Sequence, residues 1–239
     1  MNGVNTASEG ITVVATNAED VLIGPQGEIG RQPGGPMMFI KAALLEAKVS
    51  FTPIAGESIV VEILVEEELG RVPNRPTPRS LGDLVLSNWV ILSTVCGEWE
   101  VPTEGELPPR LCVDLQGIVR GDDFSEKRVW DIDPEVARNI FCIKGTCDEV
   151  AYLPARVREE QKERLLVITN GPNGVELFHK GEYRRLEATA IDDLPDTIGA
   201  GDTLMGWLTA GMYQGMKPEV AAVRAMRRTE QFLRAKRRF

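Results

Sequence analysis

The chain has 239 residues, 43% of them hydrophobic, and its 27 basic and 36 acidic side chains give a net charge of −9. A chain of this size and composition can bury one substantial core. The acidic balance argues against nucleic acid as a partner, because phosphate binding needs a basic surface, and no apolar run reaches the ~18 residues typical of a membrane span. Residues 1–10 lack the basic start and apolar centre of a signal peptide. We therefore expect a tail followed by one cytoplasmic domain over residues 11–239.

The first half of the chain predicts short strands around one helix. Pro36 suits the first turn of a helix, which the apolar pattern extends over residues 37–47. Prolines stiffen residues 71–78 into an extended connector, which need not mark a domain boundary. Apolar and β-branched runs predict strands at residues 11–15, 21–23, 28–31, 49–54 and 58–65, the second and third paired as a hairpin.

The second half predicts an α/β architecture. Its short, continuous apolar runs suit strands of a parallel sheet that is covered on both faces, and helical stretches fall between them. Asp114, Lys144 and Thr169 close three of these strands, at the edge where open α/β sheets bind ligands. The expected strands are residues 89–93, 111–114, 140–144 and 165–169, and the expected helices are residues 134–139, 157–163 and 218–239.

The cysteine and histidine content narrows the chemistry. The four cysteines form no CxxC pair and only one histidine is present, so we expect reduced thiols in the core rather than a zinc site. That histidine, His179, lies in a turn signal between residues 175–177 and 183–186, which predicts a hairpin. A Ser-His-Asp or Cys-His mechanism is therefore not expected, and any proton transfer falls to a carboxylate.

The most informative segment is residues 196–202, which read Asp-Thr-Ile-Gly-Ala-Gly-Asp directly before an apolar, helix-like run. A glycine-rich turn that opens a helix points backbone N–H groups outward at the positive end of the helix dipole, which makes an anion site. Asp202 places a potential base beside that site. The alternative interpretation is an acid near the N-terminus of a core helix, after a flexible turn.

This segment resembles the Asp-Thr-x-Gly-Ala-Gly-Asp signature of the ribokinase-like (PfkB) carbohydrate kinases at every fixed position. The family's diglycine, its central Asp-x-Asn/Gln-x turn and its Thr-x-Gly loop are similar to residues 33–35, 114–117 and 165–174, so the resemblance spans about residues 11–235. It implies a three-layer α/β sandwich, in which helices flank a mostly parallel central sheet. A reduced β lid is implied at about residues 21–31 and 58–65.

The resemblance implies a kinase that transfers the γ-phosphoryl group of ATP, with Mg²⁺, to a hydroxyl of a sugar, polyol or nucleoside. Asp202 is then the base, and the N–H groups around Gly199, Ala200 and Gly201 form the anion hole. Further implied contacts are Asp20, Gly34, Gly35 and Gln116 with substrate, Thr169, Gly171, Gly174 and Thr197 with nucleotide, and Glu149 with Mg²⁺. The plainer alternatives are a turn acid for Asp20, an ordinary turn at residues 171–174 and a solvent-facing helix-start acid for Glu149.

Four departures from the family pattern bear on the site. Phe39 stands where the family usually has an asparagine, and Thr146 replaces another asparagine near Glu149. The lid is small, and such lid strands often pair in a homodimer. The chain ends soon after the signature helix, so less helix is expected around the adenine. Phe39 weakens a ribose-type assignment and suggests an inositol-like or other polyol kinase. The missing asparagine, the small lid and the early chain end favour the alternative, a catalytically weak nucleotide- or sugar-binding protein on the same fold. No Rossmann or P-loop motif occurs in the sequence.

Overall fold

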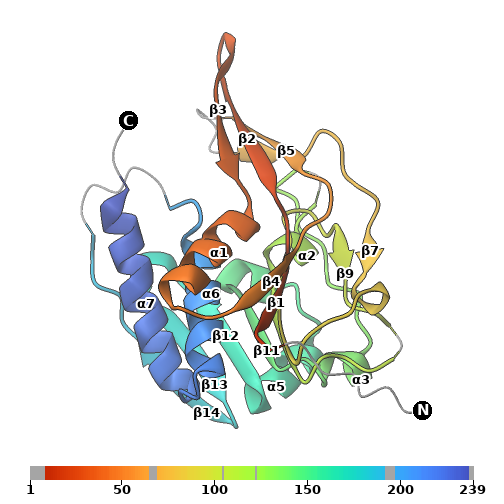
Figure 1. The fold of residues 1–239 in the computed structure, drawn as a ribbon, viewed down its shortest axis with the longest axis vertical. Coiled ribbons are helices and arrows are strands. Elements are labelled where there is room, and N and C mark those ends of the chain that lie inside the picture. Colours follow the sequence, from red (N-terminus) through yellow and green to blue (C-terminus); the bar gives the residue numbers. More distant parts are fainter. Residues whose placement is uncertain (1–8, 65–68, 104, 122, 192–196, 237–239) are drawn as a thin grey trace.

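The structure, a computed structural model, describes residues 9–64, 69–103, 105–121, 123–191 and 197–236. An eight-stranded sheet forms its centre, with strand order β14-β13-β12-β11-β10-β8-β1-β4 (Figure 1). The six strands from β12 to β4 are parallel, and the hairpin of β13 and β14 adds an antiparallel edge. The strands are β1 (Ile11–Ala15), β4 (Phe51–Ile54), β8 (Trp89–Ser93), β10 (Arg110–Asp114), β11 (Cys142–Thr146), β12 (Leu165–Thr169), β13 (Val175–His179) and β14 (Glu182–Leu186).

Helices cover both faces of this sheet, as the continuous apolar strands predict. Successive side chains of a strand point to opposite faces, and Val13 and Val14 accordingly belong to two different buried clusters. The Val13 cluster includes α1 (Pro36–Glu46), α6 (Ala200–Tyr213) and α7 (Pro218–Ala235). The Val14 cluster includes α2 (Gln116–Val119), α3 (Pro134–Ala137), α4 (Cys147–Val150) and α5 (Ala155–Glu163). The result is the predicted three-layer sandwich.

A second sheet, of order β3-β2-β5-β6, projects from one end of the sandwich and corresponds to the expected lid (Figure 1). It has its own small apolar cluster, which includes Ile59 and Val61. Residue 65, the last of the expected lid residues, lies outside the described residues. The lid strands are β2 (Ala18–Gly24), β3 (Gly27–Gly34), β5 (Ile59–Leu64) and β6 (Leu69–Arg71), and a separate pair is β7 (Arg79–Ser80) with β9 (Trp99–Glu100).

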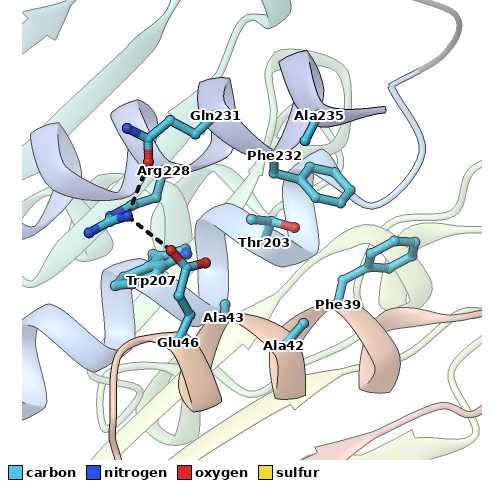
Figure 2. Close-up of a pocket in the computed structure, with 10 residues that line it drawn as sticks. All are labelled: Phe39, Ala42, Ala43, Glu46, Thr203, Trp207, Arg228, Gln231, Phe232 and Ala235. Atoms are coloured by element: carbon cyan, nitrogen blue, oxygen red, sulfur yellow. Dashed lines mark hydrogen bonds and ion pairs between the residues drawn. The ribbon is translucent and has the colours of Figure 1, made fainter. Parts of the chain in front are cut away.

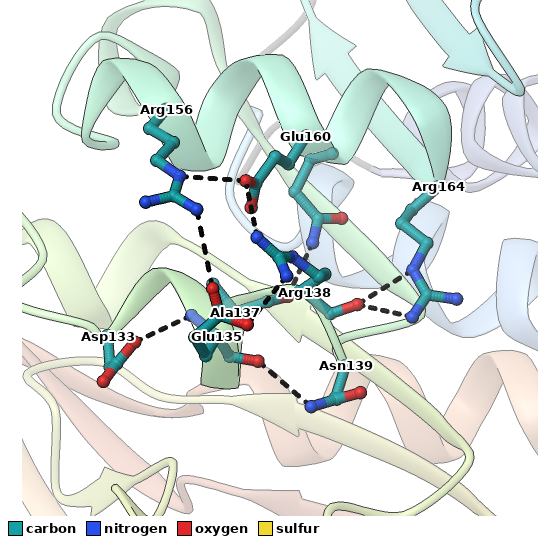
Figure 3. A network of polar contacts seen from close by, with 9 residues as sticks. Asp133, Glu135, Ala137, Arg138, Asn139, Arg156, Glu160 and Arg164 are labelled. Atoms are coloured by element: carbon teal, nitrogen blue, oxygen red, sulfur yellow. Dashed lines mark hydrogen bonds and ion pairs between the residues drawn. The ribbon is translucent and has the colours of Figure 1, made fainter.

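Exposed ion pairs join α3 to α5 on the outer face of the sandwich (Figure 3). Arg138, at the end of α3, contacts Glu160 of α5 at 3.2 Å, and Arg156 of α5 contacts Glu135 of α3 at 3.5 Å. Because solvent screens such pairs, they contribute little to the stability of the fold. The buried apolar contacts of the two helices therefore dominate their docking.

Most predicted elements are confirmed within a few residues, with several local corrections. The β11 strand begins at Cys142, two residues later than expected, and α2, α4, β6, β7 and β9 were not predicted. All four cysteines are free, but Cys147 is exposed rather than part of the core. No helix among the described residues is long and apolar enough to cross a membrane. Residues 237–239 of the expected last helix lie outside the described residues.

Candidate active site

Asp202 lies in the first turn of α6 and is almost fully buried, with 6% of its surface exposed. Ser93, the last residue of β8, donates a hydrogen bond from its Oγ to the Asp202 Oδ1 at 3.2 Å. Burial and the nearby Asp114 carboxylate raise the pKa of Asp202 to about 6, although Lys144, Ser93 and Arg120 oppose the rise. A carboxylate with such a pKa is ionised at neutral pH and still basic enough to accept a proton.

A tight turn precedes Asp202 and opens α6. The Ala200 N–H donates to the Thr197 carbonyl at 3.1 Å, and Gly199 adopts a left-handed conformation with φ of 78°. Asp196, the first residue of the signature, lies outside the described residues, and Thr197 is exposed. Of the predicted anion-hole donors, Ala200 is thus engaged within the turn. The turn still sits at the positive end of the α6 dipole, beside the buried Asp202 carboxylate.

Phe39 packs directly against this turn. A Cβ added at Gly199 would lie 2.4 Å from the Phe39 ring, which also makes an edge-to-face contact with Phe232 at 5.7 Å. Phe39 belongs to α1, so it joins the helix that follows the diglycine to the signature turn. The aromatic ring that departs from the family pattern therefore covers the turn instead of offering a polar group.

Gly199→Ala is expected to lower the free energy of unfolding by more than about 1–2 kcal/mol, which is the cost of a left-handed alanine alone. The added methyl group would also clash with Phe39. Gly215→Ala is the matched control, since Gly215 has a φ of 86° with no atom within 4 Å of an added Cβ. Urea denaturation of both variants measures the difference. Equal losses would show that Phe39 does not constrain the turn.

A buried ion pair lies beneath the turn. Lys144 Nζ is 2.7 Å from Asp114 Oδ2, and the two side chains are 2% and 0% exposed. They pair in register on the adjacent strands β10 and β11. A Cβ added at Gly201 would lie only 2.8 Å from Lys144 Nζ, which places the ammonium group against the signature turn. Burial opposes the charge of Lys144, but Asp114, Glu149 and Asp202 outweigh it and keep its pKa above the ordinary value.

The predicted substrate residues form a second group at the base of the lid. Asp20 was expected at the end of the first strand, but it lies within β2, because the chain re-enters a strand at Ala18. Its carboxylate rests against Gly34, where an added Cβ would meet it at 2.3 Å. Burial raises the pKa of Asp20, and a hydrogen bond with Gln32 opposes the rise. Asp20 is therefore a buried acid of the lid rather than a simple turn acid.

Contacts at the ends of β1 and β8 connect the residues around Asp202 with the predicted substrate residues at the base of the lid. A Cβ added at Gly35 would lie 2.8 Å from the Thr16 carbonyl. Thr16 in turn donates its N–H to the carbonyl of Ser93 at 3.2 Å, and Ser93 bonds Asp202. The diglycine and Asp202 are thus linked through contacts at one edge of the sheet. Gln116 joins the same edge, since its N–H donates to Asp114 Oδ1 at 3.3 Å.

Glu149 is the carboxylate that the resemblance assigns to Mg²⁺. It is buried, so the solvent-facing alternative is wrong. Its Oε2 accepts the N–H of Thr146 at 2.8 Å, and the Thr146 hydroxyl accepts the N–H of Glu149 at 3.2 Å, which forms a capping box. No group of three or more metal-ligating side chains occurs among the described residues. One carboxylate suits Mg²⁺, which keeps most of its ligands as water and phosphate oxygens.

The residues predicted to bind nucleotide have fewer contacts with one another than the residues around Asp202. The Thr169 hydroxyl bonds the Gly145 carbonyl at 3.4 Å, which links the ends of β11 and β12. Gly171 is exposed in a short 3₁₀ turn (Gly171–Asn173). Gly174 is buried, and an added Cβ would lie 2.0 Å from the Leu186 carbonyl, so it serves the close approach of β14. No hydrogen bond among the described residues joins residues 169–174 to Thr197.

A groove of about 350 Å³ lies beside the signature helix, between α1, α6 and α7 (Figure 2). Its rim is aromatic, with Trp207 beneath Arg228, whose guanidinium also bonds Glu46 at 2.9 Å. None of the predicted site residues lines it. The groove is therefore distinct from the site around Asp202, although Thr203 and Phe39 border both.

Three features of the site were not predicted from the sequence: the hydrogen bond from Ser93 to Asp202, the effect of the Arg120 charge on the pKa of Asp202, and the pairing of Lys144 with Asp114. Strand-end position was the available signal for Ser93, Asp114 and Lys144. Nothing in the chain marks Arg120 except its place six residues after Asp114.

Three comparisons agree with this geometry. Residues 139–227 match the pfkB family of carbohydrate kinases. Inositol 3-kinase of Arabidopsis thaliana is 26% identical over 121 residues, which cover 47% of this chain and 33% of that protein. A pyrophosphate-dependent ribokinase-family kinase, solved with a pyrophosphate analogue and myo-inositol, has a TM-score of 0.72 at 18% identity, over 94% of this chain and 95% of that one. Arabidopsis thaliana ribokinase, solved with ribose and ATP, has a TM-score of 0.66 at 15% identity, over 96% and 94%.

The chain therefore has a ribokinase-like fold. Residues 139–227 match the PfkB carbohydrate kinase family, so the predicted resemblance is confirmed. The alignment with the curated relative spans only a third of that protein's length. The fold matches, by contrast, extend over nearly all of both chains.

Proposed function

We propose that this protein is a kinase that transfers a phosphoryl group to a hydroxyl of a small polyol, with an inositol as the leading acceptor. The observation that carries the proposal is the buried Asp202 beside the left-handed turn at the start of α6. Asp202 accepts the hydroxyl proton as the oxygen attacks phosphorus. The turn and the helix dipole stabilise the charge on the transferring group. Phosphoryl transfer needs little covalent participation by the protein. It is therefore sufficient that the protein positions donor and acceptor and stabilises the negative charge of the transferring group.

The acceptor side supports a polyol. Asp20 supplies a carboxylate that can accept hydrogen bonds from two hydroxyls, and the lid of β2, β3, β5 and β6 adjoins it. Phe39 replaces the polar residue of the usual pattern and lies against the signature turn, which disfavours a ribose-type assignment. The relatives named for inositol substrates agree with this preference.

ATP is the proposed donor, and pyrophosphate is the second candidate. The loop around Thr169 and Gly171 would face a nucleotide, as the family resemblance implies. A structural neighbour named as pyrophosphate-dependent makes the smaller donor a specific alternative. Mg²⁺ bound near Glu149 would neutralise phosphate charge. A homodimer through the lid stays a prediction.

A matrix of donors and acceptors tests the proposal. ATP and pyrophosphate are each combined with myo-inositol, ribose, fructose and a nucleoside in the presence of Mg²⁺, and formation of the phosphorylated product is followed by mass spectrometry. We expect turnover with an inositol. Donor binding without turnover on any acceptor would instead support the alternative, a catalytically weak binding protein on the same fold.

The rate should depend on pH through Asp202. Because the base must be ionised, we expect kcat to fall as the pH decreases through about 6, and to level off above it. Measurements of kcat from pH 5 to 8 at constant ionic strength test this expectation. A flat profile over that range would contradict the assignment of Asp202 as a base with a pKa of about 6.

A further inference from the structure

Arg120 is a cation at the carboxyl edge of the sheet that the mechanism above does not use. It terminates α2, just after the turn that contains Asp114 and Gln116. Its side chain is partly buried, and its guanidinium carbon lies 3.8 Å from the centre of the Phe124 ring. Within the described part of the chain, no acceptor hydrogen-bonds its guanidinium and no carboxylate lies at ion-pair distance from it.

The surroundings of Arg120 place it in the electrostatic field of the candidate site. Glu149, Asp202 and Asp114 all act on its charge, while burial lowers its pKa from the ordinary value. An arginine nevertheless stays protonated in proteins. Burying part of a cation without a hydrogen-bonded partner costs free energy. A ligand that supplied hydrogen-bond acceptors to the guanidinium of Arg120 would therefore bind more tightly, because the side chain is already held in place.

The contact with Phe124 makes the guanidinium suitable for an anion. Stacking covers one face of the planar group and restricts its rotation, which leaves the N–H groups along its edge for hydrogen bonding. Such a fork matches two oxygens of a phosphoryl group, as it matches a carboxylate. Asp114 is one of the carboxylates that act on the charge of Arg120, and it pairs with Lys144, which lies against the signature turn.

We propose that Arg120 is a further catalytic residue that binds the phosphoryl group during its transfer, which rests on the proposed kinase function. The bond from phosphorus to the acceptor oxygen forms while the bond to the leaving phosphate oxygen breaks. The hydroxyl proton passes to Asp202, and Arg120 keeps all of its protons. Its contribution is charge stabilisation, which grows as negative charge accumulates on the oxygens of the transferring group and the leaving phosphate.

Arg120→Gln should lower kcat by about 10³-fold or more at saturating donor and acceptor, because arginines in this role contribute about 10³–10⁵ to kcat. Arg120→Lys should recover only a small part, since an ammonium group lacks the fork. Free guanidinium ion should restore activity to the glutamine variant, which a purely structural arginine would not allow. Arg79→Gln is the matched control, because Arg79 stacks on Trp99 at 4.4 Å in the separate β7–β9 pair.

Calorimetric binding of pyrophosphate separates this proposal from the proposed function. Absent turnover in the wild type, with pyrophosphate binding that is lost in Arg120→Gln and kept in Arg79→Gln, would refute the kinase and support the phosphate contact. The inference is overturned if Arg120→Gln keeps both kcat and pyrophosphate affinity. It is also overturned if guanidinium fails to rescue a variant whose thermal unfolding matches the wild type.

Discussion

Asp202→Asn is expected to lower kcat by about 10²–10⁴-fold, the usual contribution of a positioned general base. Asparagine has nearly the same volume, and its amide oxygen can still accept the hydrogen bond from Ser93 Oγ. It cannot take a proton from the acceptor hydroxyl. The change therefore removes the chemistry and leaves the packing of the first turn of α6 in place. Product formation under saturating donor and acceptor measures the effect.

Two further measurements make this result specific. Asp131→Asn alters an exposed acid and should leave kcat unchanged. Donor affinity should persist in Asp202→Asn, because removal of a nearby negative charge does not weaken binding of a phosphate anion. Full activity in Asp202→Asn would exclude the proposed mechanism, whereas the fold and the family signature would stand.

Lys144→Met should be the most destabilising change at the site, with a loss of about 3–5 kcal/mol in the free energy of unfolding. The substitution leaves the carboxylate of Asp114 fully buried without its cation. Chemical denaturation measures the loss. The paired variant Lys144→Met/Asp114→Leu should recover most of it, since well-packed apolar residues can replace a buried ion pair at little cost. Equal instability of the single and paired variants would mean that volume, rather than charge, decides the effect.

Besides its effect on stability, the Lys144→Met substitution should change the pH dependence of catalysis. Lys144 opposes the rise in the pKa of Asp202, so its removal should move the acid limb of the kcat profile above the value of about 6 expected for the wild type. The shift is toward higher pH, because loss of a cation disfavours the carboxylate. An unchanged limb in a folded Lys144→Met protein would show that Asp202 does not depend on this charge.

Much of the candidate site could be predicted from local sequence. The signature turn needs a left-handed residue, which Gly199 provides, and it must open a helix, which the apolar run after Asp202 specifies. The strands of the parallel core were recognisable because burial on both faces requires continuous apolar runs. The small strands β6, β7 and β9 have no such runs, so local patterns could not reveal them.

The partners of each site residue were not predictable in the same way. Ser93 and Asp202 are 109 positions apart, and Lys144 and Asp114 are 30 apart. Only the order of the strands brings these pairs together. Glu149 illustrates the limit, since its sequence context allowed a solvent-facing acid, whereas the packing of α4 on the sheet buries it.

By itself, the sequence determined the class of fold and the segment that carries the chemistry, because hydrophobic period and turn residues are local properties of a chain. The tertiary structure decided the charge balance around that segment. It buried Asp202 beside Asp114, Lys144 and Arg120, and it laid Phe39 over the turn. Burial and proximity set these interactions, and both depend on contacts between residues far apart in the chain.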